Sequence, residues 1–202
     1  MLDFSRPREP TKLETNVNDV TVELLGLLAP LLNDDITSET DLDPSARSAA
    51  VEPAMLQQAL MNLCTNARDA MPDGGALTIE TRAIHLTEAV DKARPGDYVR
   101  LAVRDTGCEI PDDLRDRILE PFFSTKEPSK GTGLGLSMVY TILQQHHGYL
   151  EIESEVNRGT TIAMHFPVVP QPADSSDDTL PQLLDHLSDF SAVQPFCEVS
   201  QP

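Results

Sequence analysis

The stretch Gln57–Met71, QQALMNLCTNARDAM, decides most of what this sequence predicts. Asn62, Asn66 and Asp69 recur at i, i+4 and i+7, so they line up on one face of a helix. Asn and Asp each cost a helix about 0.5–0.7 kcal/mol relative to Ala, whereas a solvated face more cheaply uses Lys, Glu or Arg. This face therefore indicates the wall of a polar pocket. A second face carries an apolar stripe that predicts a core contact: Leu56, Leu60, Leu63, Cys64, Ala67 and Met71.

The short amides on the polar face suit a divalent metal. An amide oxygen is a hard ligand, and Mg²⁺ binds such oxygens together with phosphate oxygens and water. Asn66 is the candidate metal ligand. The alternative is that Asn62 and Asn66 are capping or solvated residues, and the helix alone does not decide between these interpretations.

Three later segments favour the pocket. They are VRDTGCEIP at Val103–Pro111, EPFFSTK at Glu120–Lys126 and KGTGLGLS at Lys130–Ser137. With the Asn-rich helix they resemble, in the same order, the four boxes of the ATP-binding catalytic domain of sensor histidine kinases. The resemblance runs from about Leu13 to Val168. It implies the fold shared with gyrase, the mismatch-repair ATPase and the large heat-shock chaperone, which is an α/β sandwich with helices on one face of a mixed sheet (the Bergerat-type fold). It also implies ATP and Mg²⁺ as cofactors.

Three residues are candidates for binding the adenine. Asp105 follows a predicted strand, and a buried carboxylate there can accept a hydrogen bond from the adenine amine, whereas guanine has a carbonyl at that position. The alternative is an Asp that closes an Asx-turn. Gly107 permits a close approach of the backbone to the base. The resemblance implies that Thr160 supports the base through its hydroxyl and water; the alternative is an ordinary strand threonine.

The glycine-rich segment and its neighbour are candidates for binding the phosphates. Gly131, Gly133 and Gly135 lead directly into a predicted helix, whose free N–H groups and dipole suit an anion. The chain has neither a P-loop nor a Rossmann motif. The resemblance places Phe122, Phe123 and Lys126 in the nucleotide lid. Lys126 is a candidate phosphate contact as a point charge, or else a solvated loop lysine.

Asn62 also bears on the type of reaction. Hydrolytic members of the superfamily have a Glu there as general base, and an amide cannot take a proton. The sequence therefore resembles the kinase branch, which transfers the γ-phosphoryl group to a histidine, and a chaperone-type ATPase is disfavoured. None of the five histidines lies in an acceptor context: His85, His146, His147, His165 and His186. The expected partners are thus a phosphoacceptor hairpin in cis (absent from this chain) or in trans, and a response regulator downstream.

Glu109 departs from the family pattern. The first Gly box normally reads Asp-x-Gly-x-Gly, and Glu109 replaces its second glycine with an anion near the expected phosphates. This departure keeps a non-enzymatic alternative open: a degenerate ATP-fold module that binds a protein partner.

Composition and charge limit the class of protein. The net charge is −18, from 15 basic and 33 acidic residues, which argues against nucleic acid or an anionic membrane as a partner. The longest apolar run, Leu24–Leu32, is too short to cross a bilayer, which needs ~20 residues. The first residues contain no apolar h-region, so we expect no signal peptide, and the three widely spaced cysteines predict neither a zinc site nor a disulfide framework. We expect a cytoplasmic domain with no membrane insertion.

The chain divides into three parts. Residues 1–12 are expected to be a remnant of the acceptor hairpin and its linker, residues 13–169 the catalytic domain, and residues 170–202 an acidic tail. The apolar residues of Thr179–Phe190 have the spacing of an amphipathic helix. The alternative is a linker segment in which this spacing is accidental. Expected helices are Val20–Leu32 (capped by Asn16 or Asn18), Ala54–Met71, Pro111–Leu119 and Leu136–His147. Expected strands are Ile36–Leu42, Ala49–Glu52, Ala76–Ile84, Tyr98–Arg104, Tyr149–Glu155 and Thr160–Val168.

Overall fold

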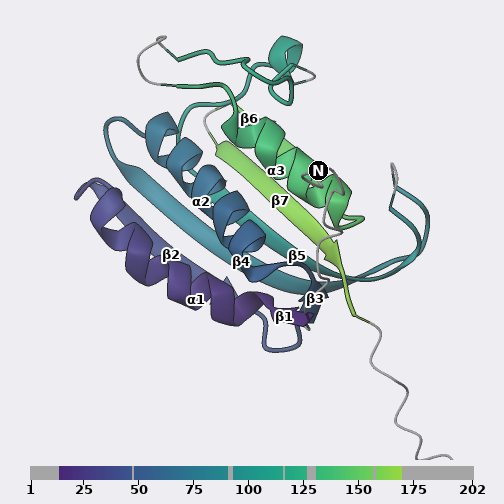
Figure 1. Cartoon of the computed structure of the whole chain (residues 1–202). Coiled ribbons are helices and arrows are strands. Elements are labelled where there is room, and N and C mark those ends of the chain that lie inside the picture. The colour runs from purple at the N-terminus through teal and green to yellow at the C-terminus, as the bar shows by residue number, and fades with distance from the viewer. Residues whose placement is uncertain are drawn as a thin grey trace, which may run out of the picture. The chain divides into compact units, whose positions relative to one another are not determined.

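Five strands form one mixed sheet in the order β2-β4-β5-β7-β6 (Figure 1). The computed structural model describes residues 14–46, 48–90, 93–115, 117–126, 131–156 and 158–169, so the expectations for residues 1–12 and for Thr179–Phe190 lie outside the described residues. The sheet strands are β2 (Ile36–Leu42), β4 (Gly75–Leu86), β5 (Gly96–Asp105), β6 (Tyr149–Glu155) and β7 (Gly159–Pro167). The other elements are β1 (Glu14–Asn16), α1 (Val17–Leu28), η1 (Ala29–Leu31), β3 (Ser48–Ala50), α2 (Pro53–Ala70), η2 (Asp112–Leu114) and α3 (Gly135–Gln145).

The strand pairing brings the predicted base-binding residues together. β2 runs parallel to β4, and the other neighbours in the sheet are antiparallel. In this register Asp105, the last residue of β5, lies opposite Leu77 of β4 and Thr160 of β7. Asp105 and Thr160 are therefore cross-strand neighbours whose side chains point to the same face of the sheet.

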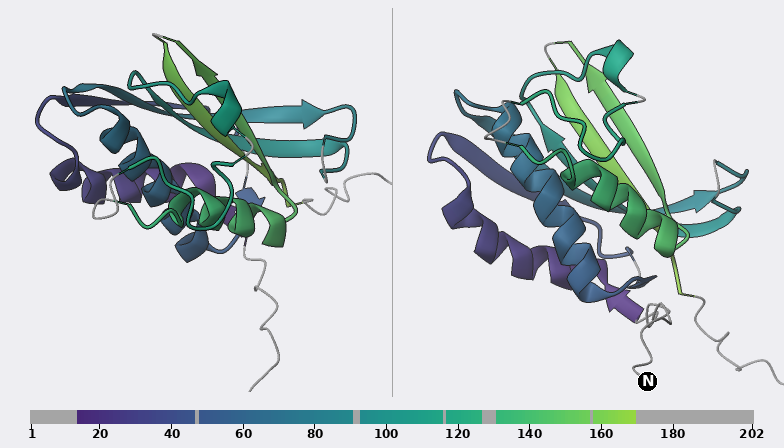
Figure 2. Two further views of the ribbon diagram at one scale, coloured as in Figure 1. Left: turned by 90° about the horizontal axis from the view of Figure 1, so that it is seen from above. Right: turned by 45° about the horizontal axis from the view of Figure 1, so that its top comes forward.

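The helices α1, α2 and α3 lie on one face of this sheet (Figures 1 and 2). The apolar stripe of α2 is buried against it, with Leu56, Leu60 and Cys64 fully inaccessible. Full burial of a Leu side chain contributes about 1.5–3 kcal/mol, so the stripe holds α2 firmly in place. The predicted two-layer α/β sandwich is confirmed.

The local predictions succeed where periodicity is long. The helix expected at Ala54–Met71 is observed at Pro53–Ala70, with Pro53 in the first turn, where its missing N–H costs nothing. The α-helix expected at Pro111–Leu119 is wrong: its described residues form only the 3-10 turn η2 and further isolated turns. The short strand β1 was not expected.

The first helix begins earlier than expected, and the two candidate caps have different roles. The Asn16 Oδ1 accepts hydrogen bonds from the backbone N–H groups of Asn18 and Asp19, at 3.0 and 3.4 Å. It therefore caps α1 at Val17. Asn18 instead donates to the Asp43 carbonyl and accepts from the Thr81 hydroxyl, which ties α1 to the sheet.

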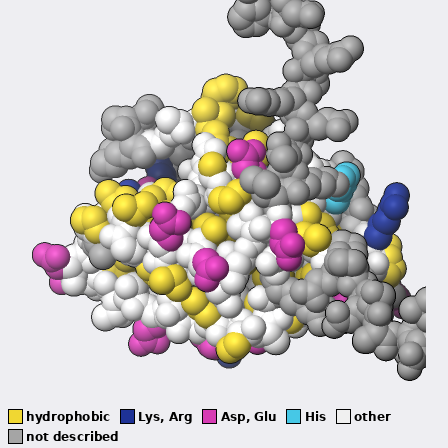
Figure 3. All heavy atoms as spheres, turned by 60° about the horizontal axis from the view of Figure 1, so that its bottom comes forward, with side chains coloured by type: hydrophobic (Ala, Val, Ile, Leu, Met, Phe, Trp, Pro, Cys, Tyr) yellow, Lys and Arg dark blue, Asp and Glu magenta, His cyan; other side chains and the backbone are white. Residues whose placement is uncertain are grey.

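The surface reflects the acidic composition. On the face drawn in Figure 3, acidic side chains are scattered among exposed hydrophobic ones, and basic side chains are few. None of the helices in the described part of the chain is long and apolar enough to cross a membrane. Cys64 and Cys108 are both free thiols, and burial raises the pKa of the Cys64 thiol to about 12.

Candidate functional site

A pocket of about 520 Å³ is lined by α2, the start of α3 and the paired ends of β5 and β7. Nine of the eleven predicted site residues line it, and Gly107 and Phe122 do not. The nine are Asn62, Asn66, Asp69, Asp105, Lys126, Gly131, Gly133, Gly135 and Thr160. Residues that are up to about 100 positions apart in the sequence thus meet around one cavity, whose size lies within the range of small-molecule sites.

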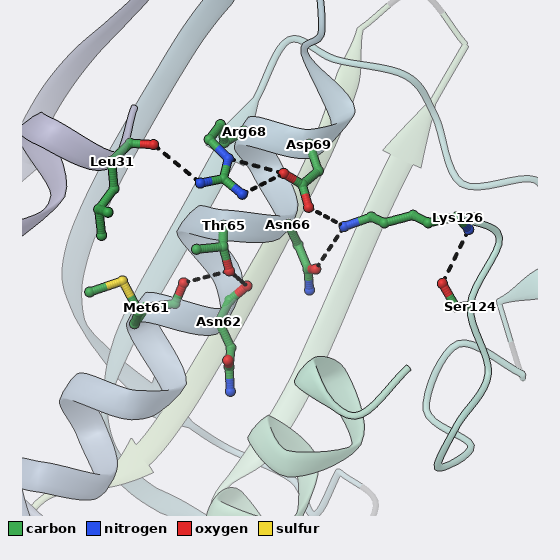
Figure 4. A network of polar contacts seen from close by, with 9 residues as sticks. All are labelled: Leu31, Met61, Asn62, Thr65, Asn66, Arg68, Asp69, Ser124 and Lys126. Carbon is green, nitrogen blue, oxygen red and sulfur yellow. Dashed lines mark hydrogen bonds and ion pairs between the residues drawn. The ribbon is translucent and has the colours of Figure 1, made fainter. Parts of the chain in front are cut away.

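The polar face of α2 forms one wall of the pocket, and its side chains engage the segment that precedes the glycines (Figure 4). The Lys126 ammonium donates to Asp69 Oδ2 at 2.6 Å and lies 3.4 Å from Asn66 Oδ1. The Arg68 guanidinium donates to the other carboxylate oxygen of Asp69 at 2.7 Å and to the Leu31 carbonyl at 3.2 Å. Asp69 therefore lies between two cations, of which only Lys126 contacts Asn66 as well.

This arrangement shifts the pKa of Asp69. Partial burial on its own would raise the pKa of the Asp69 carboxyl, but the hydrogen bonds from Lys126 and Arg68 outweigh burial. The net result is a pKa below the ordinary value of 3.8. Asp69 therefore stays ionised at neutral pH and keeps the Lys126 side chain against the α2 wall.

The oxygens of this wall are compatible with a hard cation. An amide oxygen of Asn66 and a carboxylate oxygen of Asp69 already converge on one positive charge, the Lys126 ammonium. Mg²⁺ takes one or two such protein ligands and completes its shell with water and phosphate oxygens. Within the described residues there is no cluster of three or more His, Cys, Asp or Glu that could hold a metal by itself. The donor set thus fits a metal that arrives with a phosphate ligand.

Asp105 and Thr160 form a buried polar pair at the sheet. Both side chains are about 95% buried. Burial raises the pKa of the Asp105 carboxyl, and hydrogen bonds from the backbone of Gly107 and Thr160 partly oppose that increase. One carboxylate oxygen accepts from the Gly107 N–H at 2.9 Å, so Asp105 closes a local turn and lines the pocket at the same time. The two interpretations of Asp105 made from the sequence are therefore compatible.

The glycines have separable roles. Gly133 has φ +67°, and a Cβ there would collide with the Phe122 backbone, so this turn requires glycine. A Cβ at Gly107 would collide with the backbone of Ala70, so Gly107 lets the loop after β5 pack against α2. A Cβ at Gly135 would lie 3.6 Å from Asn66 Nδ2. The N-terminus of α3 thus lies beside the asparagine wall.

The two phenylalanines of the expected lid lie in different surroundings. Phe122 has φ +68° and is 77% exposed, outside the pocket lining. Phe123 lines the pocket, and the Arg117 guanidinium lies over its ring at 4.5 Å from the centroid. A cation over an aromatic face is an attractive contact, so Arg117 holds Phe123 in place. Of the two, Phe123 is the one that a ligand in this pocket can touch.

Ser154 was missed by the sequence analysis. Its hydroxyl oxygen accepts from the Ile110 N–H at 2.8 Å and lies 2.9 Å from the Thr160 hydroxyl. Arg115 donates to the Ser154 carbonyl at 2.6 Å. The only signal in the sequence is a polar residue on the core-facing side of a predicted strand, where an apolar residue is expected.

Glu109, which replaces the second glycine of the first Gly box, is one of the residues that line the pocket. It and Cys108 both line the cavity and are both exposed. The Cys108 N–H donates to the Ala70 carbonyl at 3.0 Å, which fixes this loop against α2. The Glu109 carboxylate therefore adds negative charge at the mouth of a pocket that already contains Asp69 and Asp105.

Comparison with known proteins agrees with this geometry. Residues 51–170 match the family described as histidine kinase-, DNA gyrase B-, and HSP90-like ATPase. The sensor kinase CckA of Brucella abortus (strain 2308) is 41% identical over 171 residues, which cover 83% of this chain and 18% of CckA. Sporulation kinase E of Bacillus subtilis (strain 168) is 32% identical over 170 residues, which cover 83% of this chain and 21% of that kinase.

The fold also resembles solved structures. The catalytic domain of the histidine kinase ThkA superposes with a TM-score of 0.65 at 28% identity, over 78% of this chain and 98% of that domain. The chain spans about a fifth of the length of the two curated kinases, and it matches nearly the whole of the ThkA domain. The chain belongs to the histidine kinase-, DNA gyrase B- and HSP90-like ATPase family.

Proposed function

We propose that this chain is the ATP-binding catalytic domain of a two-component sensor histidine kinase. It binds Mg-ATP and presents the γ-phosphate to a histidine on a separate hairpin. One observation carries the proposal: the residues predicted for the base, Asp105 and Thr160, and those predicted for the phosphates, Asn66 and the start of α3, line one pocket. The kinase names of the relatives support the same assignment.

Binding follows from the charges of the pocket. Asp105 accepts from the adenine amine, and the start of α3 offers its free N–H groups to phosphate oxygens. Lys126 exchanges its contact with Asp69 for the terminal phosphate. Asn66, one helical turn from Asn62, would supply an amide oxygen to hold Mg²⁺, and the metal would neutralise phosphate charge. Asp69 holds Lys126 before the nucleotide arrives.

The reaction needs no base from this chain. The acceptor imidazole nitrogen forms a bond to the γ-phosphorus while the bond to the bridging oxygen breaks, which leaves ADP. Asn62 cannot activate water, so hydrolysis does not compete through this residue. Catalysis is mainly positioning and charge stabilisation. The acceptor hairpin is the immediate partner, a response regulator acts downstream, and the cytoplasm supplies the ATP.

Phosphotransfer to a hairpin in trans tests this function. The chain is incubated with γ-labelled ATP and Mg²⁺, alone and with a separately produced acceptor hairpin from a related kinase. We expect acid-labile label on the hairpin and none on the chain, and Asn66→Ala should abolish the transfer. Acid-labile label on the chain alone would contradict the assignment of the acceptor to another segment.

Glu109 favours a second candidate, a degenerate module that binds a protein partner without turnover. Its carboxylate lines the pocket and opposes the negative charge of a triphosphate. On that account the chain does not bind Mg-ATP, and the hairpin stays unlabelled even when the chain is in excess.

A further inference from the structure

Ser154 lies behind the pocket and makes hydrogen bonds to two of its lining residues, Ile110 and Thr160. It is 94% buried at the core-facing side of β6, and Thr160 opposite it in β7 is 95% buried. The Ser154 hydroxyl oxygen accepts from the Ile110 N–H at 2.8 Å, lies 2.9 Å from Thr160 Oγ1 and lies 3.5 Å from the Gly159 carbonyl. It thus connects the loop that carries Glu109 with the predicted base-binding threonine.

The hydrogen bonds that link Ile110, Ser154 and Thr160 run in one direction, from donor to acceptor. The Ile110 N–H can only donate, so the Ser154 oxygen accepts from it and has one hydrogen left to give. That hydrogen can reach Thr160 Oγ1 at 2.9 Å or the Gly159 carbonyl at 3.5 Å, and a hydroxyl donor prefers about 2.7–2.8 Å. Either hydroxyl can donate across the 2.9 Å contact, but if Thr160 donated, the Ser154 hydrogen would have only the Gly159 carbonyl at 3.5 Å, which is longer than an ordinary O–H···O hydrogen bond. Ser154 is therefore the better donor to Thr160. Thr160 then accepts from Ser154, and its own hydrogen is left for an acceptor elsewhere.

We infer that Ser154 is a positioning residue for base recognition: it fixes the Thr160 hydroxyl as a hydrogen-bond donor toward the pocket. Asp105, the cross-strand neighbour of Thr160, is an acceptor in the same pocket. The two residues therefore offer an acceptor beside a donor. Adenine has the complementary edge, an amine next to a ring nitrogen with a lone pair, whereas guanine has a carbonyl next to a ring N–H. The inference rests on the proposed function and adds a residue that sets its base selectivity.

The test compares ATP with 1-deaza-ATP, in which carbon replaces the ring nitrogen next to the amine. Dissociation constants are measured by calorimetry for the unaltered chain, Ser154→Ala, Ser154→Thr and Thr160→Val, with melting temperatures recorded alongside. The unaltered chain should bind ATP about threefold to tenfold more tightly than the analogue, as one hydrogen bond predicts. Ser154→Ala should lower this ratio by about threefold, because the freed hydroxyl hydrogen is shared among three staggered positions. Ser154→Thr keeps the hydroxyl and should keep the ratio.

The outcomes separate a positioning role from a packing role. Thr160→Val should bring the ratio close to one, and adding Ser154→Ala to it should change the ratio no further. If Ser154→Ala lowers the melting temperature or weakens both ligands equally while the ratio stays unchanged, Ser154 only anchors the loop and the inference is wrong. An unaltered chain that binds both nucleotides equally would also overturn it. Absence of any ATP binding would overturn the proposed function and this inference with it.

Discussion

Replacing Lys126 with Gln should weaken ATP binding much more than ADP binding. In the free protein this side chain makes an ion pair with Asp69 at 2.6 Å and a longer contact with Asn66 at 3.4 Å. The two charged side chains are 32% and 27% exposed, so their ion pair contributes about 0.5–1 kcal/mol. A charge-assisted hydrogen bond to a terminal phosphate contributes about 1.5–3 kcal/mol. The difference, about 1–2 kcal/mol, corresponds to a loss of about 5- to 30-fold in ATP affinity.

Calorimetric titration with ATP and with ADP at one Mg²⁺ concentration measures this loss. Lys126→Arg retains the charge and should retain most of the affinity. The nucleotide-free melting temperature of Lys126→Gln should fall by only about 1–4 °C, because a single partly exposed ion pair is lost and Arg68 still neutralises Asp69. Equal losses for ATP and ADP, or an unchanged ATP affinity, would refute the idea that Lys126 moves to the terminal phosphate.

Three further perturbations follow from the same geometry. Asn66→Ala should abolish Mg²⁺-dependent nucleotide binding at nearly unchanged thermal stability; a variant that unfolds yet binds normally in its folded fraction would make Asn66 structural. Glu109→Gly should tighten Mg-ATP binding, and the gain in affinity should shrink in high salt. If the negative charge is the cause, Glu109→Gln should show most of the same gain. Equal Mg-ATP affinities for the unaltered chain and Glu109→Gly would remove the main support for the degenerate module. Because the folded pKa of Asp69 is lowered, its contribution is fully present above the ordinary value of 3.8 and is lost as pH falls through the lowered value. As the pH is lowered from about 5 to about 2, the free energy of unfolding, measured by denaturant titration, should therefore fall less for Asp69→Asn than for the unaltered chain. Parallel plots of this free energy against pH for the two proteins would contradict the linkage.

Long periodic elements were predictable from the sequence, and short irregular ones were not. The burial of Leu60 and Cys64 and the position of α2 follow from helical spacing alone. The segment Pro111–Leu119 contains apolar residues at suitable intervals, but its described residues form only single turns. Local turn hydrogen bonds such as Ile118 N–H to the Leu114 carbonyl do form, but Arg115 also donates to the Ser154 carbonyl and the Ile110 N–H donates to the Ser154 hydroxyl, so contacts with β6 help to set the path of this segment.

The candidate site residues were predictable where their side-chain chemistry and motif spacing point to a nucleotide. Asn66, Asp105 and the glycines at 131, 133 and 135, which the motifs predicted as site residues, all line the pocket. What the motifs could not reveal depends on the backbone path: Phe122 adopts a positive φ and is exposed, so that Phe123 lines the pocket instead. Ser154 is likewise invisible without the register of β6 and β7, which places its hydroxyl against Thr160.

A calorimetric titration decides whether this pocket binds Mg-ATP through Asp105 and Asn66. Mg-ATP and Mg-GTP are titrated into the unaltered chain and into Asp105→Asn, and Mg-ATP is titrated again with the Mg²⁺ chelated. We expect one ATP site that requires Mg²⁺ and prefers ATP to GTP, and we expect Asp105→Asn to reduce that preference by about 1.5–3 kcal/mol through loss of a charge-assisted hydrogen bond. Absence of ATP binding, or equal binding of ATP and GTP by the unaltered chain, would contradict this expectation.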